Sequence, residues 1–361
     1  MELTKDKPLM NSTILVTGGC GYIGSHTVLS LLEKGCDVII LDNLKNSHPE
    51  VINRIEKLGG KRPDFIEGDI RDKSLLDKIF SSHSISSVVH FAGLKAVGES
   101  HIKPLHYYEN NVIGSLNLLR AMEQAGVFKL VFSSSATVYG EPLELPISEA
   151  HPTSNPASPY GRSKLMVEEI LQDLASSDDN WKIAILRYFN PIGAHASGLI
   201  GENPNGVPNN LLPYISQVAI GKLKELSIFG NDYPTKDGTG IRDYIHVCDL
   251  AEGHSKALDA LESTTGVSIW NLGTGNGYSV LEIVQAFEAA CGINIPYIIR
   301  TRRPGDIAAC WADPSKASDE LGWKAKLTLS NMMKDTWRWQ SLNPNGFLEL
   351  PQKIPPEILL N

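Results

Sequence analysis

The sequence has few cysteines and none of the patterns that cysteine and histidine form around metals. Its five cysteines in 361 residues are widely spaced and include no C-x-x-C pair. A disulfide framework or a zinc knuckle is therefore not expected, and a reducing compartment is the better interpretation. The ten histidines show no H-E-x-x-H or similar spacing, so the sequence predicts no metal site. His90 and His246 are interpreted as structural histidines.

A basic excess and long apolar runs are also missing. The net charge of -8 argues against nucleic acid as the main partner, because phosphate backbones require a basic face. The first residues, MELTKDKPLM, lack the apolar core of a signal peptide, and no later run is long enough to span a bilayer. No G-x-S-x-G elbow is present, which weakens a hydrolase interpretation. The sequence predicts a cytoplasmic protein that does not associate with membranes.

What the sequence does contain is an alternation of short β-branched runs with helical segments. Such alternation predicts an α/β fold, a Rossmann-type doubly wound parallel sheet. Strands are expected near 13–19, 37–42, 87–93, 129–135, 182–190 and 268–273, and helices near 22–34, 49–59, 103–125, 157–175 and 249–262.

The second half is organised differently. Residues 191–240 are rich in Gly, Pro and Asn, as is common in loops that line a cleft. We expect a larger domain from 12–190 and 235–274, and a smaller, discontinuous α/β domain from 191–234 and 275–350. The tail at 351–361 has no assigned role.

A glycine-rich turn follows the first expected strand. In TGGCGYIGSH, Gly18, Gly21 and Gly24 permit a tight turn and close approach of the backbone to a pyrophosphate at the start of a helix. Asp42 ends the second strand, where a carboxylate can bind the adenosine ribose and repel a 2′-phosphate. The larger domain is therefore predicted to bind NAD, with Asp69 as an expected adenine contact. A turn or helix-capping role for Asp42 is the alternative.

A second motif is the spacing of Tyr160 and Lys164 in SPYGRSK. On a helix the two side chains share a face, and a nearby ammonium favours the phenolate, which is a base for a sugar hydroxyl. With 11 tyrosines, such a spacing arises about 0.7 times by chance, so alone it is not specific. Ser135, at the end of the strand in FSSSATVYG, could hydrogen-bond the phenol. Ser135, Tyr160 and Lys164 together predict a catalytic set.

With these motifs the chain resembles the extended short-chain dehydrogenases/reductases, and within them the UDP-galactose 4-epimerase family. The similarity runs from about Ser12 to Gly346. It includes DNLKNS, HFAGLKAVGES, RYFNPIGAH, GVPNNLLPYI, FGNDYPTKDGTGIRDYIHV and RRPGDIAACWADPSKA. The resemblance implies an NAD-dependent epimerase of galactose and nucleotide-sugar metabolism. It would invert C4 of a UDP-hexose through a transient 4-keto sugar, with the smaller domain binding the UDP-sugar and a homodimer formed through the helices near 103–125 and 157–175.

The resemblance also implies roles for individual residues. The cofactor would be held by Gly18, Gly21, Tyr22, Ile23, Gly24, Asp42, Asn43, Asp69, Ile70, Phe91, Ala92, Gly93, Lys95, Asn110, Tyr160 and Lys164. The UDP-sugar would contact Asn190, Asn210, Leu211, Phe229, Arg242, Arg303, Asp306 and Cys310. The two arginines suit a diphosphate, which requires fixed bidentate donors. Surface salt bridges are the alternative for them.

The chain departs from the family in two places. Residues 1–11 and about 350–361 extend beyond the shorter members. Cys310 stands where epimerases restricted to glucose and galactose have a bulky tyrosine. A small residue there would enlarge the sugar pocket, and we expect N-acetylated UDP-hexosamines such as UDP-GlcNAc and UDP-GalNAc to be accepted as well. A simple packing role for Cys310 is the alternative.

Three other functions remain open at this stage. An NDP-sugar 4,6-dehydratase usually has an Asp-Glu pair beside the serine, where this sequence has Ala136 and Thr137. A net dehydrogenase or reductase would require turnover of external cofactor. A non-catalytic NAD-binding sensor usually loses the Tyr–Lys pair, which is intact here.

Overall fold

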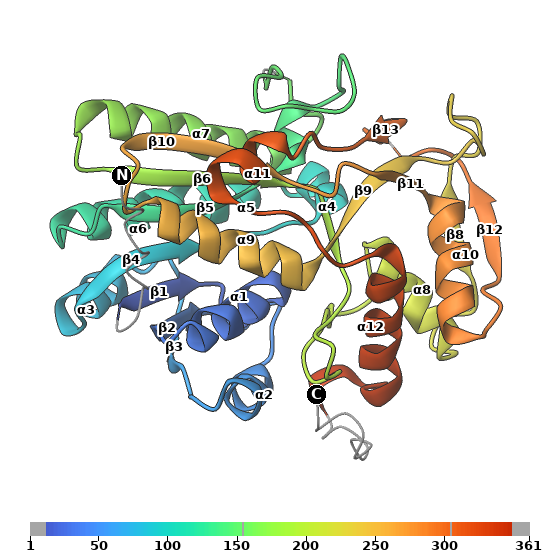
Figure 1. The fold of residues 1–361 in the computed structure, drawn as a ribbon, viewed down its shortest axis with the longest axis horizontal. Helices are drawn as coiled ribbons and strands as arrows, with labels where there is room; N and C mark the ends of the chain where they lie inside the picture. The colour runs from blue at the N-terminus through green and yellow to red at the C-terminus, as the bar shows by residue number, and fades with distance from the viewer. Residues whose placement is uncertain (1–11, 154, 304, 349–361) are drawn as a thin grey trace, which may run out of the picture.

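A seven-stranded parallel sheet organises the larger part of the molecule (Figure 1). The computed structural model describes residues 12–153, 155–303 and 305–348, so the predicted tail and the extension at 1–11 lie outside it. The strand order is β10-β6-β5-β4-β1-β2-β3. Their bounds are β1 (Thr13–Thr17), β2 (Asp37–Asp42), β3 (Asp64–Glu67), β4 (Ile85–His90), β5 (Lys129–Ser135), β6 (Lys182–Tyr188) and β10 (Gly266–Leu272).

Helices cover both faces of this sheet because its strands are apolar on both sides. Along β1, Ile14 and Val16 face one hydrophobic core, and Leu15 faces the other. The first core is closed by α1 (Tyr22–Glu33), α2 (Glu50–Gly59), α9 (Val247–Ala260) and α11 (Ser315–Leu321). The second is closed by α3 (Lys73–Ser82), α6 (Gly114–Gln124) and α7 (Pro159–Ser177). The predicted Rossmann-type α/β fold is confirmed.

A smaller unit lies at one end of the molecule (Figure 1). One sheet joins β7 (Asn190–Ile192), β9 (Ile241–His246), β11 (Gly277–Ser279) and β13 (Ala309–Cys310), and a second pairs β8 (Leu226–Phe229) with β12 (Tyr297–Arg300). Its helices are α8 (Leu211–Ala219), α10 (Val280–Cys291) and α12 (Leu329–Leu342). Strand β9 belongs to this smaller sheet, although its residues fall in the segment 235–274 assigned above to the larger domain.

Two predicted segments have more internal structure than expected. The helix expected near 103–125 is divided into α5 (Pro104–Tyr107), a π-helical turn (Tyr108–Ile113) and α6, and α4 (Val97–Ile102) precedes it. The loop-rich stretch 191–240 contains α8 and β8. Short 3-10 turns occur at Ala136–Tyr139 and Gly346–Leu348. The π-helical turn is of interest because such turns are frequent at functional sites.

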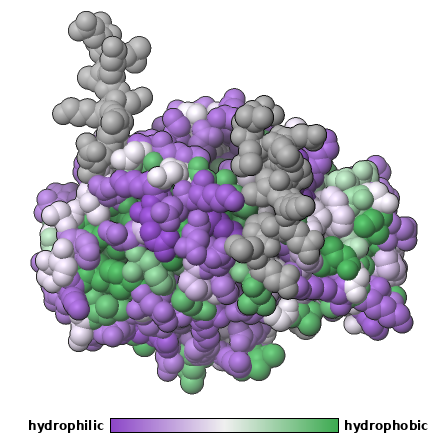
Figure 2. Space-filling view, turned by 90° about the horizontal axis from the view of Figure 1, so that it is seen from below, coloured by the Kyte–Doolittle hydropathy of each residue, from purple (hydrophilic) through white to green (hydrophobic). Residues whose placement is uncertain are grey.

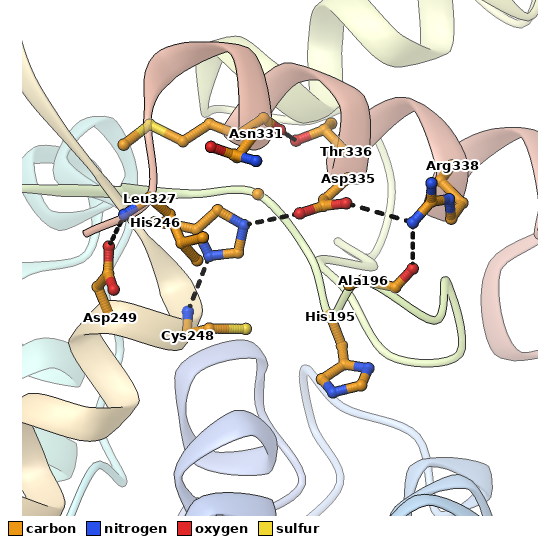
Figure 3. Close-up of polar contacts among 12 residues, drawn as sticks. His195, Ala196, His246, Cys248, Asp249, Leu327, Asn331, Asp335, Thr336 and Arg338 are labelled. Carbon is orange, nitrogen blue, oxygen red and sulfur yellow. Dashed lines mark hydrogen bonds and ion pairs between the residues drawn. The ribbon is translucent and has the colours of Figure 1, made fainter. Parts of the chain in front are cut away.

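The interpretation of His90 and His246 as structural is confirmed by their contacts. His90 lies between Thr17 and Ser115, at 2.7 and 2.9 Å, and burial lowers its pKa to about 3. Nε2 of His246 lies 3.2 Å from Asp335 on α12, and Nδ1 accepts from the backbone of Cys248 (Figure 3). These bonds join the strand–helix junction of β9 and α9 to the C-terminal helix.

The face drawn in Figure 2 is largely hydrophilic, with hydrophobic residues in smaller groups toward its two ends. Within the described ranges, no helix is both long enough and apolar enough to cross a membrane. Among the same residues, no cluster of three or more His, Cys, Asp or Glu side chains could hold a metal ion.

Candidate active site

The carboxyl ends of β1, β2, β4, β5 and β6 open into one cavity of about 740 Å³. All of the predicted cofactor residues except Asp69 line it, together with Ser135. Its wall contains Gly18, Gly21, Tyr22, Ile23, Gly24, Asp42, Asn43, Ile70, Phe91, Ala92, Gly93, Lys95, Asn110, Ser135, Tyr160 and Lys164. The glycine-rich turn and the Ser135, Tyr160 and Lys164 side chains thus line the same cavity.

The glycine turn is packed too tightly for side chains. Gly18 has a φ of 71°, and a Cβ on it would lie 2.8 Å from the backbone nitrogen of Ala92. A Cβ on Gly24 would lie 2.2 Å from the carbonyl oxygen of Gly18. Gly21 is the N-cap of α1 and has no side chain to accept from the backbone N–H groups of the first turn. These N–H groups can therefore donate to a phosphate. This cradle fits a dinucleotide.

Asp42 lies beside the cradle with acceptor capacity to spare. Its Oδ1 accepts from the backbone of Leu44 (2.9 Å) and the hydroxyl of Ser47 (2.8 Å), and its Oδ2 accepts from the backbone of Cys20 (3.0 Å). A carboxylate oxygen can accept two hydrogen bonds, so Oδ2 can accept one more, from a ribose hydroxyl. The bonds to the loop also fix the side chain in place.

Asp69 lies between two residues of the cavity wall, Gly68 and Ile70, and its adenine contact stays a prediction. It does not line the cavity; Arg71 donates to it from Nε and Nη2, each at 2.8 Å, and Asn43 donates at 2.9 Å. The Arg71 guanidinium holds the pKa of this carboxyl well below its usual range. Asp69 therefore orients Asn43, and Ile70 is the neighbour that reaches the cavity.

Tyr160 and Lys164 lie in the first turns of α7, which Ser158 caps by accepting from the backbone of Gly161 at 3.1 Å. Both side chains are buried. Lys164 donates from Nζ to the carbonyl oxygen of Ser133 at 2.6 Å. The hydroxyl of Ser135 accepts from Thr137 at 3.0 Å and hydrogen-bonds Tyr160.

The electrostatics of this pair differ from the sequence-based expectation. Burial raises the pKa of Tyr160, and only the Ser135 hydrogen bond acts against that rise. Burial likewise lowers the pKa of Lys164 to about 8, while Glu168 raises it. The Nζ of Lys164 donates to the Ser133 carbonyl of β5, and Ser135 hydrogen-bonds the phenol of Tyr160.

The predicted sugar-nucleotide residues fall into two groups. Asn190 and Asn210 line the cavity, and Leu211 follows at the start of α8. The other group lies outside the cavity wall, where Asp306 pairs with both Arg242 (3.9 Å) and Arg303 (3.1 Å). Arg303 also lies over the ring of Phe229, 4.5 Å from its centroid. Two guanidinium groups share one carboxylate there, which leaves positive charge for an anion.

Cys310 is buried in a small hydrophobic cluster on β13, opposite Arg242 on β9. Burial raises the pKa of its thiol to about 12, so it is not a reactive thiolate. It does not line the cavity, but it packs in the same cluster as Phe189, which does.

Several residues of the cavity wall were not predicted from the sequence. Glu202 accepts from Lys95 at 3.1 Å and from Asn210 at 2.9 Å, and so joins the loop after β7 to the loop after β4. Tyr188 lies at the end of β6 and hydrogen-bonds Ser133. The glycine-, proline- and asparagine-rich composition of 191–240 was the only signal for Glu202. Tyr188 belongs to the motif RYFNPIGAH, but no role was predicted for it.

Comparison with known proteins identifies the family. A family model described as GDP-mannose 4,6 dehydratase matches residues 15–336. The UDP-glucose 4-epimerase of Bacillus subtilis is 59% identical over 334 residues, which cover 92% of this chain and 98% of that protein. The chain belongs to the UDP-glucose 4-epimerase family, within the extended short-chain dehydrogenases/reductases.

Solved structures of this epimerase family agree with the fold. The Bifidobacterium longum UDP-glucose 4-epimerase, in complex with NAD+ and UDP, has a TM-score of 0.91 and 55% identity, covering 93% of this chain and all of that one. The UDP-Glc/GlcNAc 4-epimerase of Campylobacter jejuni has a TM-score of 0.80 and 37% identity, covering 92% and 99%.

The tightness of the glycine turn gives a first prediction. Gly24→Ala places a methyl against the backbone of Gly18, so the turn must open; we expect loss of at least about 10-fold in NAD retention and a lower melting temperature. Gly98→Ala is the control, because a Cβ there meets nothing within 4 Å. Bound NAD is measured after gel filtration. If Gly24→Ala retained as much NAD as the wild type, the proposed binding of the pyrophosphate by the glycine turn would be wrong.

Proposed function

We propose that this chain is an NAD-dependent UDP-glucose 4-epimerase, which interconverts UDP-glucose and UDP-galactose through a transient 4-keto sugar. The observation that carries the proposal is the convergence of the glycine cradle and the Ser135, Tyr160 and Lys164 side chains on one cavity, in a chain of the epimerase family.

The cofactor's place follows from the residues present. The glycine turn and the start of α1 would hold the pyrophosphate, Asp42 the adenosine ribose, and Phe91 and Ala92 the path toward Tyr160. When bound, NAD supplies a hydride acceptor for the sugar C4 and a positive charge beside the phenol. The Ser135 hydrogen bond and Lys164 would then orient the groups that handle the proton.

In the proposed mechanism Tyr160 takes the proton of the sugar 4-OH as C4 is oxidised, and returns it to the same oxygen once the opposite face is reduced. Ser135 hydrogen-bonds Tyr160 and would also hold the sugar oxygen. Arg242 and Arg303 bind the diphosphate. The keto sugar therefore stays attached to the enzyme through UDP while it rotates and presents its opposite face. The stereocentre is inverted and the enzyme ends in its starting state.

Rival chemistries are less well supported. A 4,6-dehydratase needs carboxyl groups beside the serine, and here those positions hold Ala136, which is buried, and Thr137, whose hydroxyl is bonded to Ser135. A reductase would need cofactor exchange with the solvent. A sensor would not need the intact pair of Tyr160 and Lys164.

An assay without added cofactor tests the proposal. Purified enzyme incubated with UDP-galactose should form UDP-glucose without added NAD and without net NADH, because the hydride is returned. Tyr160→Phe should lower kcat by about 10²- to 10⁴-fold with little change in KM. Chromatographic separation of the products and absorbance at the reduced-cofactor band are the readouts. Net NADH accumulation would indicate a dehydrogenase.

We further propose that the enzyme accepts N-acetylated UDP-hexosamines. The support is the small size of Cys310, which packs in the same hydrophobic cluster as Phe189, a residue of the cavity wall. A tyrosine at position 310 would be larger and would narrow the sugar end of the cavity. The Campylobacter jejuni relative, described as a UDP-Glc/GlcNAc 4-epimerase, has the same fold.

Replacement of this cysteine tests the proposed breadth. Cys310→Tyr should reduce turnover of UDP-GalNAc by more than about 10-fold and leave UDP-galactose within about 3-fold, since added bulk excludes only the larger sugar. Cys310→Ser, which preserves the size, should keep both activities. Unchanged UDP-GalNAc turnover by Cys310→Tyr would overturn the gating role and favour a packing role.

We also propose a homodimer, formed through α4, α5, the π-helical turn and α7. These adjoining elements expose large apolar side chains: Val97, Ile102, Leu105, Ile113 and Met166. Ile102 and Leu105 are 79% and 76% exposed, which is unusual for side chains of this size so close together. A division into two domains, with β9 counted in the smaller one, and a cytoplasmic location are also proposed.

The oligomeric state can be measured directly. The double variant Ile102→Asp with Leu105→Asp should shift the protein from dimer to monomer in sedimentation velocity, because charge is introduced into the apolar interface. Leu143→Asp changes a residue that is 82% exposed elsewhere on the surface and should remain dimeric. A monomeric wild type would contradict the proposal.

A further inference from the structure

Glu168 is a carboxylate with no solvent contact, on the same helix as the predicted catalytic pair. It lies four residues after Lys164 and eight after Tyr160, so all three side chains point from α7 toward the sheet. Its exposed fraction is 0%. A buried charge is costly unless it is paired and hydrogen-bonded, so its surroundings should be specific.

Those surroundings satisfy both carboxylate oxygens. Arg187 on β6 donates from Nε at 3.1 Å to Oε1 and 3.2 Å to Oε2, and from Nη2 to Oε2 at 2.5 Å. Ser134 on β5 donates its hydroxyl to Oε1. Arg187 is itself only 4% exposed and also donates to the hydroxyl of Tyr139 at 3.2 Å.

The strand residues that Glu168 holds are neighbours of the chemistry. Ser134 lies between Ser133, whose carbonyl accepts from Lys164, and Ser135, which hydrogen-bonds Tyr160. In the sheet, Ser134 pairs with Arg187 and Ser135 pairs with Tyr188, which lines the cavity. Glu168 therefore ties α7 to the ends of two strands at the level where the catalytic set is assembled.

We propose that Glu168 is a positioning residue of the epimerase reaction: clamped by Arg187 and Ser134, it fixes the spacing of Tyr160 and Lys164 on the helix relative to Ser135 on the strand. The inference rests on the proposed function, because the groups that it positions are those of the epimerase mechanism. Neither the glycine cradle nor the sugar-nucleotide residues require it.

Glu168 also provides the negative charge nearest to Lys164 on α7. The ring of Phe132 and the Ser133 carbonyl on β5, and His90 on β4, also lie near the lysine. Tyr160 on its own helix and Tyr188 on β6 line the same cavity. His90 and the two tyrosines are neutral near pH 7, since burial lowers the pKa of the histidine and raises those of the phenols. Loss of the Glu168 charge should therefore make Lys164 lose its proton at lower pH.

The test compares variants of the complete enzyme with bound cofactor. Glu168→Gln keeps the shape of the side chain and removes its charge. We expect kcat for UDP-galactose to fall by about 10- to 100-fold and KM to change by less than about 3-fold. The alkaline limb of the kcat–pH profile should move to lower pH. Glu169→Gln, on the exposed side of the same turn, is the matched control and should behave as wild type.

A double variant separates positioning from simple charge pairing. Glu168→Gln leaves Arg187 buried without its partner and could destabilise the fold for that reason alone. Glu168→Gln combined with Arg187→Met removes both charges, and we expect the melting temperature to recover toward wild type while kcat and the alkaline limb stay changed. Recovery of kcat and of the pH profile in the double variant would overturn the proposal, as would wild-type kcat in Glu168→Gln.

Failure of the epimerase function and failure of the role proposed for Glu168 give different results. Wild-type enzyme that fails to convert UDP-galactose would contradict the epimerase function. Wild-type enzyme that converts UDP-galactose, with equal kcat in Glu168→Gln, would contradict only the role of Glu168. Glu168→Asp keeps the charge but shortens the clamp, and it should keep the alkaline limb in place while lowering kcat.

Discussion

The whole site depends on one constraint of the parallel sheet, that the carboxyl ends of all its strands open on the same edge. From that edge β1 delivers the glycine turn, β2 delivers Asp42, β5 delivers Ser135 and β6 delivers Tyr188. The helix that follows β5 brings Tyr160 and Lys164 back over the same edge. Residues more than 140 positions apart in the sequence, such as Gly18 and Tyr160, thus meet in one cavity.

This constraint explains how much the sequence could predict. Buried parallel strands are short β-branched runs, and β2 and β5 form over the predicted ranges 37–42 and 129–135. The glycine turn is readable for a related reason, since a Cβ at Gly24 would meet backbone. The glycine turn, Asp42 and Ser135 could be predicted to share one edge of the sheet because each follows or ends such a strand.

Other features carry no such signal. The strands of the smaller unit are as short as two residues, and β9 pairs with segments on both sides of it in sequence, so periodicity could not assign it. The π-helical turn around Asn110 has nearly the same pattern as an α-helix. The contacts of Asp69 with Arg71 and Asn43 depend on side-chain geometry, which the sequence pattern does not show. A glutamate on a helix, such as Glu168, is usually exposed, and only the fold shows it buried.

The electrostatics of the site suit a reaction in which the proton and the hydride are removed from the sugar and then returned to it. Burial favours the neutral forms of both Tyr160 and Lys164, so the protein by itself stores no permanent phenolate. The opposing influences are fixed polar groups, namely the Ser135 hydroxyl, the Ser133 carbonyl and the Glu168 carboxylate. Such a site can stabilise a proton transfer while the sugar is oxidised and then reverse it. A net dehydrogenase must release its proton to solvent, whereas in the mechanism proposed above the buried phenol of Tyr160 gives the proton back to the oxygen from which it came.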